Sequence, residues 1–221
     1  MRRLLVMVVL LCLSATMALA QDPVKVDPGH YKVLLDNAAV RVLKVSYGVG
    51  EKSVMHAHPD AMLVPFAPAK ARFTMPDGTT QDVDVKPEAA LYTPAFTHSP
   101  ANVGTTKIDA LLVEFKAKAA GTAALPTARP GMTQTVLAEG PRATAWRTTA
   151  APTFHEAAGT IHEYDQVVIA LGPGDVKVAV EGQPTRTKWR RGDFLFIGRG
   201  VKHESQNTGG KPLDFVIVGI K

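Results

Sequence analysis

Short apolar runs, separated by glycine, proline and charged residues, recur along the chain from residue 40 to its end. Runs of this length predict β-strands, and no stretch shows the sustained periodicity with caps that predicts a helix. Predicted strands cover 40–45, 72–75, 81–85, 108–115, 167–171, 176–180, 194–197 and 213–220. The sequence Pro76-Asp77-Gly78 lies between two of them and is a hairpin turn signal. Regularly spaced strands with such turns predict an all-β sandwich or barrel.

The two halves of the chain share one skeleton of histidines, glycines and asparagines. His58 and His162 are 104 residues apart, and His98 and His203 are 105 apart. The spacing of 105 then holds without a gap for Asn102 and Asn207, Gly104 and Gly209, Asp109 and Asp214, Val113 and Val218, and Lys116 and Lys221. A period of this length is the size of a small domain, so it predicts a duplicated domain.

Four segments are expected along the chain: a signal peptide at 1–20, an N-terminal barrel at 21–116, a linker at 117–130 and a C-terminal barrel at 131–221. The linker is rich in Ala, Gly, Thr and Pro and has no apolar periodicity. The signal peptide has two arginines, an apolar run and the small-x-small site Ala18-Leu19-Ala20. We therefore expect export to the periplasm or the exterior, with no stable membrane insertion after cleavage. The alternative interpretation of this segment is a buried N-terminal helix.

Composition narrows the chemistry of the mature chain. Cys12 is the single cysteine and lies in the predicted signal peptide, which excludes disulfides, thiolate nucleophiles and cysteine-built zinc or blue-copper sites. The net charge of +5 falls to +3, from 23 basic and 20 acidic residues, once Arg2 and Arg3 are removed. Basic residues are scattered apart from 188–191, so no nucleic-acid partner is expected.

Three histidines are the strongest candidates for chemistry. Residues i and i+2 of a strand face the same side, so His56 and His58 point together into the barrel or together out of it. With His98 from a neighbouring strand they form a face of three nitrogens that leaves coordination positions open on a metal. The alternative is that these histidines are hydrogen-bonded barrel residues.

These residues resemble the two motifs of the cupin superfamily. The first motif is a glycine, five residues, His-x-His and then a glutamate, and Gly50, His56 and His58 match it. The second motif is matched by Gly192, Gly198, Gly200, His203 and Asn207, and in part by Pro94, His98 and Asn102. The resemblance covers nearly all of the mature chain and implies a bicupin: two tandem cupin jelly-roll barrels, with a divalent metal held by the motif residues. We interpret the asparagines as turn residues that bond to backbone.

The sequence departs from the family pattern in both halves. At the 104-residue offset, the glutamate position holds Met62 in the first half and Gln166 in the second. Met62 is interpreted as a core residue, with the alternative that it is a fourth ligand in a copper-favouring site. Thr160 replaces the first histidine of the second half, so only His162, Gln166 and His203 are available there. We expect the second barrel to be metal-free or to bind metal loosely.

Two classes of function follow from the resemblance. A three-histidine face resembles that of cupin dioxygenases, so a metal-dependent oxidoreductase on a small organic substrate is favoured over an isomerase or lyase. The alternative is a non-catalytic cupin that binds a small molecule or metal and has a degenerate second barrel. Iron, manganese, nickel, copper and zinc are all candidate metals. A monomer or a homodimer is expected, because two barrels of one chain can pair as cupin dimers do.

Overall fold

A computed structural model describes residues 21–116, 123 and 129–221, without the side chains of 185–187. The predicted signal peptide, its cysteine and most of the predicted linker lie outside the described residues. Strands dominate, and the single described helix is the short α1 (Pro23–Val26), which Asp22 caps by accepting a bond from the Val24 N–H. Among the residues described, no helix has the length and apolarity to cross a bilayer.

The first half folds into two antiparallel sheets. Their strands are β1 (Tyr31–Asp36), β2 (Val40–Tyr47), β3 (His56–His58), β4 (Ala61–Pro65), β5 (Ala69–Thr74), β6 (Thr80–Val85), β7 (Leu91–Thr93), β8 (Phe96–Asn102) and β9 (Ile108–Phe115). One sheet has the order β1-β2-β9-β4-β7 and the other the order β3-β8-β5-β6. The predicted hairpin is confirmed, because β5 pairs with β6 across a turn in which Gly78 has a φ of 84°.

The second half repeats this topology strand for strand. Its strands are β10 (Met132–Glu139), β11 (Ala143–Ala150), β12 (His155–Thr160), β13 (Asp165–Ala170), β14 (Gly174–Val180), β15 (Gln183–Trp189), β16 (Phe194–Ile197), β17 (His203–Asn207) and β18 (Leu213–Ile220). The two orders are β10-β11-β18-β13-β16 and β12-β17-β14-β15. Each number is that of its first-half counterpart plus nine, so the predicted architecture of two tandem jelly-roll barrels is confirmed.

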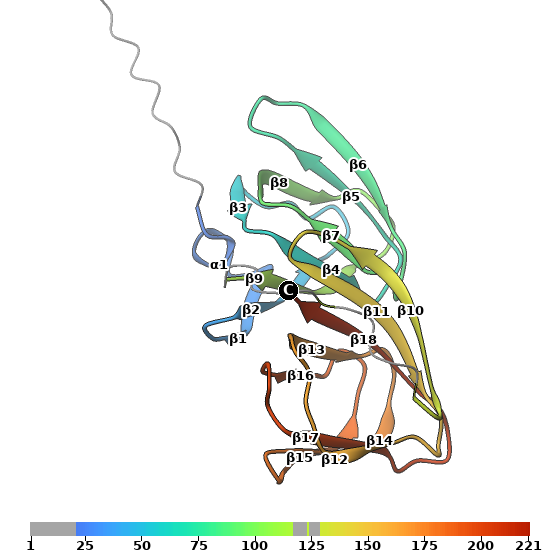
Figure 1. Cartoon of the computed structure of the whole chain (residues 1–221). Helices are drawn as coiled ribbons and strands as arrows, with labels where there is room; N and C mark the ends of the chain where they lie inside the picture. The colour runs from blue at the N-terminus through green and yellow to red at the C-terminus, as the bar shows by residue number, and fades with distance from the viewer. Residues whose placement is uncertain (1–20, 117–122, 124–128) are drawn as a thin grey trace, which may run out of the picture.

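The two five-stranded sheets face each other at the centre of the molecule, and the four-stranded sheets lie at opposite ends (Figure 1). A single hydrophobic core joins the central sheets, with Met62 and Val113 from the first barrel and Val167 and Val218 from the second. Each barrel also has an interior core of its own. The inner strands of the central sheets are therefore buried on both faces, which accounts for near-continuous apolar runs such as β9.

Alternation along β9 divides its side chains between these two cores. Ala110 and Leu112 point into the first barrel, whereas Leu111 and Val113 point into the core between the barrels. The carboxylate of Glu114 interrupts this apolar pattern and, by the same alternation, faces the barrel interior. A buried carboxylate must be paired, so its position marks a site with polar partners.

The two motif asparagines hold equivalent turns. The Asn102 side-chain amide donates to the carbonyl oxygens of Gly48 at 3.0 Å and Thr106 at 2.8 Å. The Asn207 amide donates in the same way to Ala150 at 3.0 Å and Lys211 at 2.8 Å. The interpretation of these residues as backbone-bonding turn residues is confirmed.

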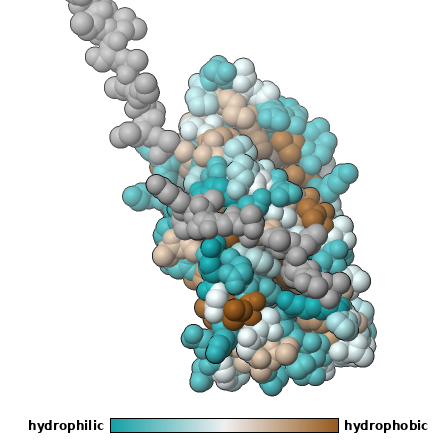
Figure 2. Space-filling view, viewed as in Figure 1, coloured by the Kyte–Doolittle hydropathy of each residue, from teal (hydrophilic) through white to brown (hydrophobic). Residues whose placement is uncertain are grey.

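Polar residues cover most of the described surface in the view of Figure 2, where hydrophobic residues form small separate groups. The exposed large apolar side chains are Val33, Leu34, Val49, Val54, Met55, Val103, Val136 and Ile161. Most of the larger apolar side chains are thus committed to the three cores.

Replacing Met62 with alanine tests its role in the core between the barrels. Met62 is fully buried in that core, so Met62→Ala should lower the free energy of unfolding by about 2–5 kcal/mol in urea titration. Metal content should not change. Met55→Ala is the control, because Met55 is 37% exposed and should change stability by less than about 0.5 kcal/mol. Loss of bound metal from a folded Met62→Ala protein would contradict the assignment of Met62 to the core alone.

Candidate metal centre

The three candidate histidines lie together in the interior of the first barrel. His56 and His58 are on β3, and His98 is the direct neighbour of His56 on β8. All three are buried, and one nitrogen from each lies within 4.8 Å of the others. The alternation inferred from His-x-His therefore does bring both side chains to the interior, where they form a cluster that could hold a metal ion.

Hydrogen bonding decides which nitrogen of each motif histidine carries the proton. His56 Nδ1 lies 2.8 Å from the Val54 carbonyl oxygen, and His58 Nδ1 lies 2.7 Å from a carboxylate oxygen of Glu114. Both partners can only accept, so each Nδ1 is the N–H and each Nε2 keeps its lone pair. The two Nε2 atoms lie 3.1 Å apart. Two lone pairs facing each other at this distance suit a cation shared between them.

His98 supplies the third nitrogen and has no hydrogen bond to satisfy it. Neither of its ring nitrogens has a partner within the described part of the chain, although the residue is buried. Its ring stacks on Phe73 at 4.8 Å and meets the edge of Phe96 at 4.1 Å. An unpaired buried polar atom costs about 1–3 kcal/mol. Coordination to a metal satisfies this atom, so the residues present fit a metal ion.

Glu114 is a site residue that the sequence motif does not reveal. Its second carboxylate oxygen accepts from Arg41 Nε at 2.5 Å, and Arg41 also donates to Asp22 at 2.8 Å. A chain of charge-assisted bonds thus runs from Asp22 through Arg41 and Glu114 to His58. Such a carboxylate fixes the orientation of a ligating histidine and raises its basicity. The signal that could have identified it is a carboxylate near the end of the apolar run of β9, where it follows Leu111, Leu112 and Val113.

Burial keeps the cluster uncharged at neutral pH. Burial first, and then the neighbouring His58, lower the pKa of His56 to about 4. Burial, followed by the charges that His58 and His56 would carry, lowers the pKa of His98 to about 2. Both rings are therefore neutral across the physiological range, which is the form that binds metal.

The strand register corrects the expected equivalence of Met62 and Gln166. Met62 pairs with Val113 and points into the core between the barrels. In the second barrel, Val167 is in that position, opposite Val218. Gln166 instead corresponds to Ala61, so the second half has one extra residue between His162 and β13, which changes the spacing from 104 to 105. Extending the 104-residue offset past the histidines had placed Gln166 one residue, and hence one face, out of phase.

An apolar cavity adjoins the histidine cluster inside the first barrel. His58 and His98 form part of its wall, and the remainder includes Leu63, Phe73 and Phe96. No lysine or arginine from the described part of the chain lines it. A small apolar molecule in this cavity would lie beside the ring nitrogens that face the barrel interior.

The second barrel brings His162 and His203 together, but a carboxylate takes the place of the third histidine in its cluster. The ring centroids of these two histidines are 5.0 Å apart. Thr160, at the position of the missing histidine, donates its hydroxyl to the Ala157 carbonyl at 2.8 Å. Gln166 is buried and lines the barrel cavity. The potential metal cluster here consists of Glu156, His162 and His203, and Glu156 was not among the residues expected from the sequence.

Comparison with known proteins identifies the fold. No family model and no curated protein matches the sequence. Salicylate 1,2-dioxygenase from Pseudoaminobacter salicylatoxidans, in its adducts with gentisate, has a TM-score of 0.62 at 12% identity and covers 84% of this chain and 70% of its own. Oxalate decarboxylase from Bacillus subtilis has a TM-score of 0.61 at 12% identity, and the match covers 82% of this chain and 68% of the decarboxylase chain.

A smaller structure agrees with these two. The cupin 2 conserved barrel domain protein from Leptotrichia buccalis has a TM-score of 0.56 at 11% identity, over 86% of this chain and 88% of its own. These neighbours are cupin-fold proteins, and the likeness to them extends over most of this chain. At such low identity it shows that this chain has the cupin fold, and it carries no activity with it.

Replacing the Glu114 carboxylate tests its effect on the neighbouring histidine. Glu114→Gln keeps the size of the side chain but leaves Arg41 without its charged partner and weakens the bond to His58. Affinity for added Zn²⁺ should fall by about 10–100-fold in titration with a competing chelator. Asp82→Asn, which removes a carboxylate from an exposed pair with Arg72, is the matched control and should leave affinity unchanged. Equal affinities in the two variants would contradict a role for Glu114 in orienting His58.

The lowered histidine pKa values predict how the stability of the metal-free protein depends on pH. An unfolded histidine titrates near 6.5, whereas His56 in the folded protein titrates near 4. Between these values the unfolded chain binds more protons, so the free energy of unfolding should fall as pH drops through this range. Urea titration of chelator-treated protein at pH 7 and pH 5 measures this change. The change should be smaller in His56→Ala/His98→Ala, and an equal change there would contradict the assignment.

Proposed function

We propose that this chain is an exported bicupin whose first barrel binds one divalent transition metal through His56, His58 and His98 and uses it in oxidoreductase chemistry of the dioxygenase type. The observation that carries the proposal is the convergence of three buried imidazoles beside an apolar cavity whose wall includes His58 and His98. In His56 and His58 the Nδ1 proton is engaged in a hydrogen bond. Three nitrogen ligands leave coordination positions for other molecules.

Each neighbouring residue has a definite task in this proposal. A bound metal supplies open coordination positions and Lewis acidity. Glu114 holds His58 in the tautomer that presents Nε2. The Tyr31 hydroxyl lies 3.1 Å from His56 Nε2, and burial raises the pKa of this phenol well above its usual value. Tyr31 is thus a neutral hydrogen-bond donor that can orient an oxygen of a substrate beside the cluster.

The lining of the cavity favours a small, largely apolar organic substrate. Phe73 and Phe96 offer aromatic surface, and no lysine or arginine is available to neutralise a dianion. Both oxalate decarboxylase and the gentisate adducts of salicylate 1,2-dioxygenase are structurally similar to this chain. The apolar lining favours a phenolic or other aromatic substrate over oxalate.

Metal identity follows only partly from the ligands. Imidazole suits iron, nickel, copper and zinc, and the neighbouring oxalate decarboxylase from Bacillus subtilis has Mn(II) centres. We keep all five metals, manganese included, as candidates.

The signal-peptide pattern at 1–20 supports export to the periplasm or the exterior. The shared core between barrels supports a monomer, with a homodimer as the alternative.

A second candidate function is metal or small-molecule binding without chemistry. Among the residues that the structure describes, Asp109 is the only carboxylate that lines the first cavity, and it is already paired with Lys44. Acid or base groups beyond the histidines, Tyr31 and Tyr47 are therefore scarce there. This observation favours a barrel that stores or carries its ligand.

Elemental analysis of the mature protein is the test of the first-barrel site. His58→Ala should lower bound metal by about one equivalent, because it removes a ligand without touching the apolar cores that hold the fold. His155→Ala, which changes an exposed histidine on β12, is the control and should keep the metal. Unchanged metal content in folded His58→Ala protein would contradict the site.

Oxygen consumption separates the two candidate functions. Metal-loaded protein should consume oxygen with gentisate or a related phenol, and consumption should be lost in His58→Ala and retained in His155→Ala. Metal bound at one equivalent without turnover of any phenol would favour the binding function.

A further inference from the structure

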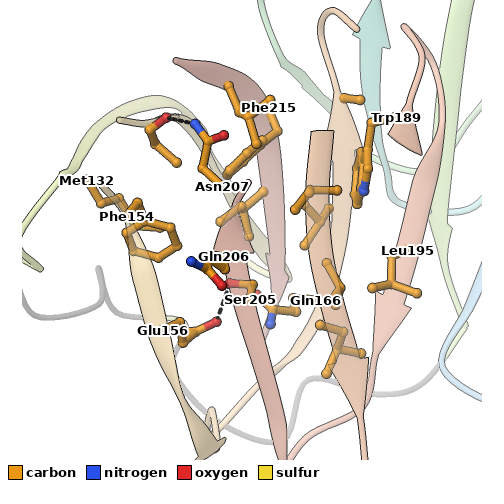
Figure 3. A pocket seen from close by; sticks show the side chains of 18 of the residues that line it. Met132, Phe154, Glu156, Gln166, Trp189, Leu195, Ser205, Gln206, Asn207 and Phe215 are labelled. Atoms are coloured by element: carbon orange, nitrogen blue, oxygen red, sulfur yellow. Dashed lines mark hydrogen bonds between the residues drawn. The ribbon is translucent and has the colours of Figure 1, made fainter. Parts of the chain in front are cut away.

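The second barrel contains a cluster with a different set of donors from that of the first. Glu156 lies on β12, His162 precedes β13 and His203 opens β17. Their candidate ligand atoms all lie within 4.8 Å of one another. Glu156 and His203 are buried, with exposed fractions of 7% and 3%. The cluster borders the largely apolar interior cavity shown in Figure 3.

The carboxylate of this cluster comes from a position that holds a serine in the first barrel. Glu156 pairs with Ser205 across β12 and β17. In the first barrel, the Ser53 N–H donates to the carbonyl of Pro100, which is 105 residues before Ser205. Glu156 therefore takes the place of Ser53. The second barrel has lost a histidine at Thr160 and gained a carboxylate four residues earlier in the chain.

The ring of His203 presents an unprotonated nitrogen to this carboxylate. Its Nδ1 lies 3.1 Å from the Val201 carbonyl oxygen, which can only accept, so Nδ1 carries the proton. Its Nε2 then has a lone pair and lies 3.4 Å from Glu156 Oε2. His162 Nε2 lies 3.8 Å from the other carboxylate oxygen. The Nε2 lone pair of His203 and the carboxylate of Glu156 are thus two acceptors that face each other in a buried site, and a cation between them stabilises this arrangement.

Arg129 supplies that cation in the metal-free protein. Its Nη1 forms an ion pair with Glu156 Oε1, while the Ser205 hydroxyl donates to Glu156 Oε2 at 2.8 Å. The bond from Ser205 is visible in Figure 3. The guanidinium thus neutralises the carboxylate at Oε1, the oxygen that faces His162. A metal ion can enter only if this ion pair opens.

We propose that the second barrel is a separate site for a divalent transition metal, with Glu156, His162 and His203 as ligands, and that Arg129 competes with the metal for Glu156. Two imidazoles and one carboxylate on one side of an ion suit zinc, iron, cobalt or manganese and leave positions open. Competition by Arg129 makes this site weaker than that of the first barrel. The site goes beyond the function proposed above and does not depend on it.

The test uses protein in which the first barrel is silenced by His56→Ala/His58→Ala/His98→Ala. Titration with Co²⁺, followed by its visible absorption, then reports on the second barrel alone. About one equivalent should bind. Adding Arg129→Gln should tighten binding roughly tenfold, because the competing charge-assisted bond is removed. Adding Glu156→Gln should weaken Co²⁺ binding about a hundredfold, because it removes a ligand. Loss of a residue that only supports a ligand already costs about 10–100-fold.

Two control variants locate the ligands within the barrel. Gln166→Ala removes the amide expected from the sequence to be a ligand, and His155→Ala removes an exposed histidine on the same strand as Glu156. Both should bind Co²⁺ like the parent. Far-UV circular dichroism and thermal melting verify that each variant is folded.

Absence of Co²⁺ binding in the folded Arg129→Gln protein overturns the proposal, as does unchanged affinity in Glu156→Gln. If the triple variant does not fold, the same substitutions are made in the otherwise unaltered protein and bound metal is counted. Glu156→Gln should then lower the count from about two equivalents to about one, and a count unaffected by Glu156→Gln overturns the proposal. Loss of the first-barrel metal alone bears on the function proposed above and leaves the second site standing.

Discussion

Packing of the two five-stranded sheets against each other is the constraint on which the rest of this structure depends. Inner strands of these sheets, such as β4 and β9, are buried on both faces, so their side chains alternate between the barrel interior and the core between barrels. This division sends Met62 away from the histidines and brings Glu114 toward them. A shift of one residue in register would exchange the faces of these two side chains. The second half has one extra residue before β13, but the pairing of β13 with β18 matches that of β4 with β9.

The two barrels use a buried carboxylate in two different ways. In the first, one carboxylate oxygen of Glu114 accepts from His58 Nδ1 and the other accepts from Arg41. Glu114 therefore orients His58 from outside the histidine cluster. In the second, Glu156 faces the Nε2 lone pair of His203, with His162 Nε2 at 3.8 Å, and Arg129 balances its charge. Since a buried carboxylate must be paired, each barrel carries its own arginine. The duplicated fold thus supports two sites of unequal chemistry.

The interior of both barrels is mainly apolar outside these clusters. The first cavity combines aromatic and small side chains, and the second combines Met132, Phe154, Leu195 and Phe215 with the polar groups at Glu156 (Figure 3). An apolar cavity with a few convergent polar atoms is the usual form of a small-molecule site. In both barrels the apolar cavity therefore lies beside a group of imidazoles.

The sequence by itself determined the class of fold and the histidine cluster. Strand-length runs with Gly and Pro turns specify a β architecture, and the alternation in His56-Ala57-His58 directs two imidazoles to one face. Only the tertiary structure decided which residues complete the sites. Glu114, Arg41 and Arg129 reach their partners from strands and segments remote in the chain, and no local spacing encodes such contacts. The register of β4 and β13 also decided which faces Met62 and Gln166 occupy. The face of a side chain depends on how its strand pairs with its neighbours, and counting residues along the chain does not reveal that pairing.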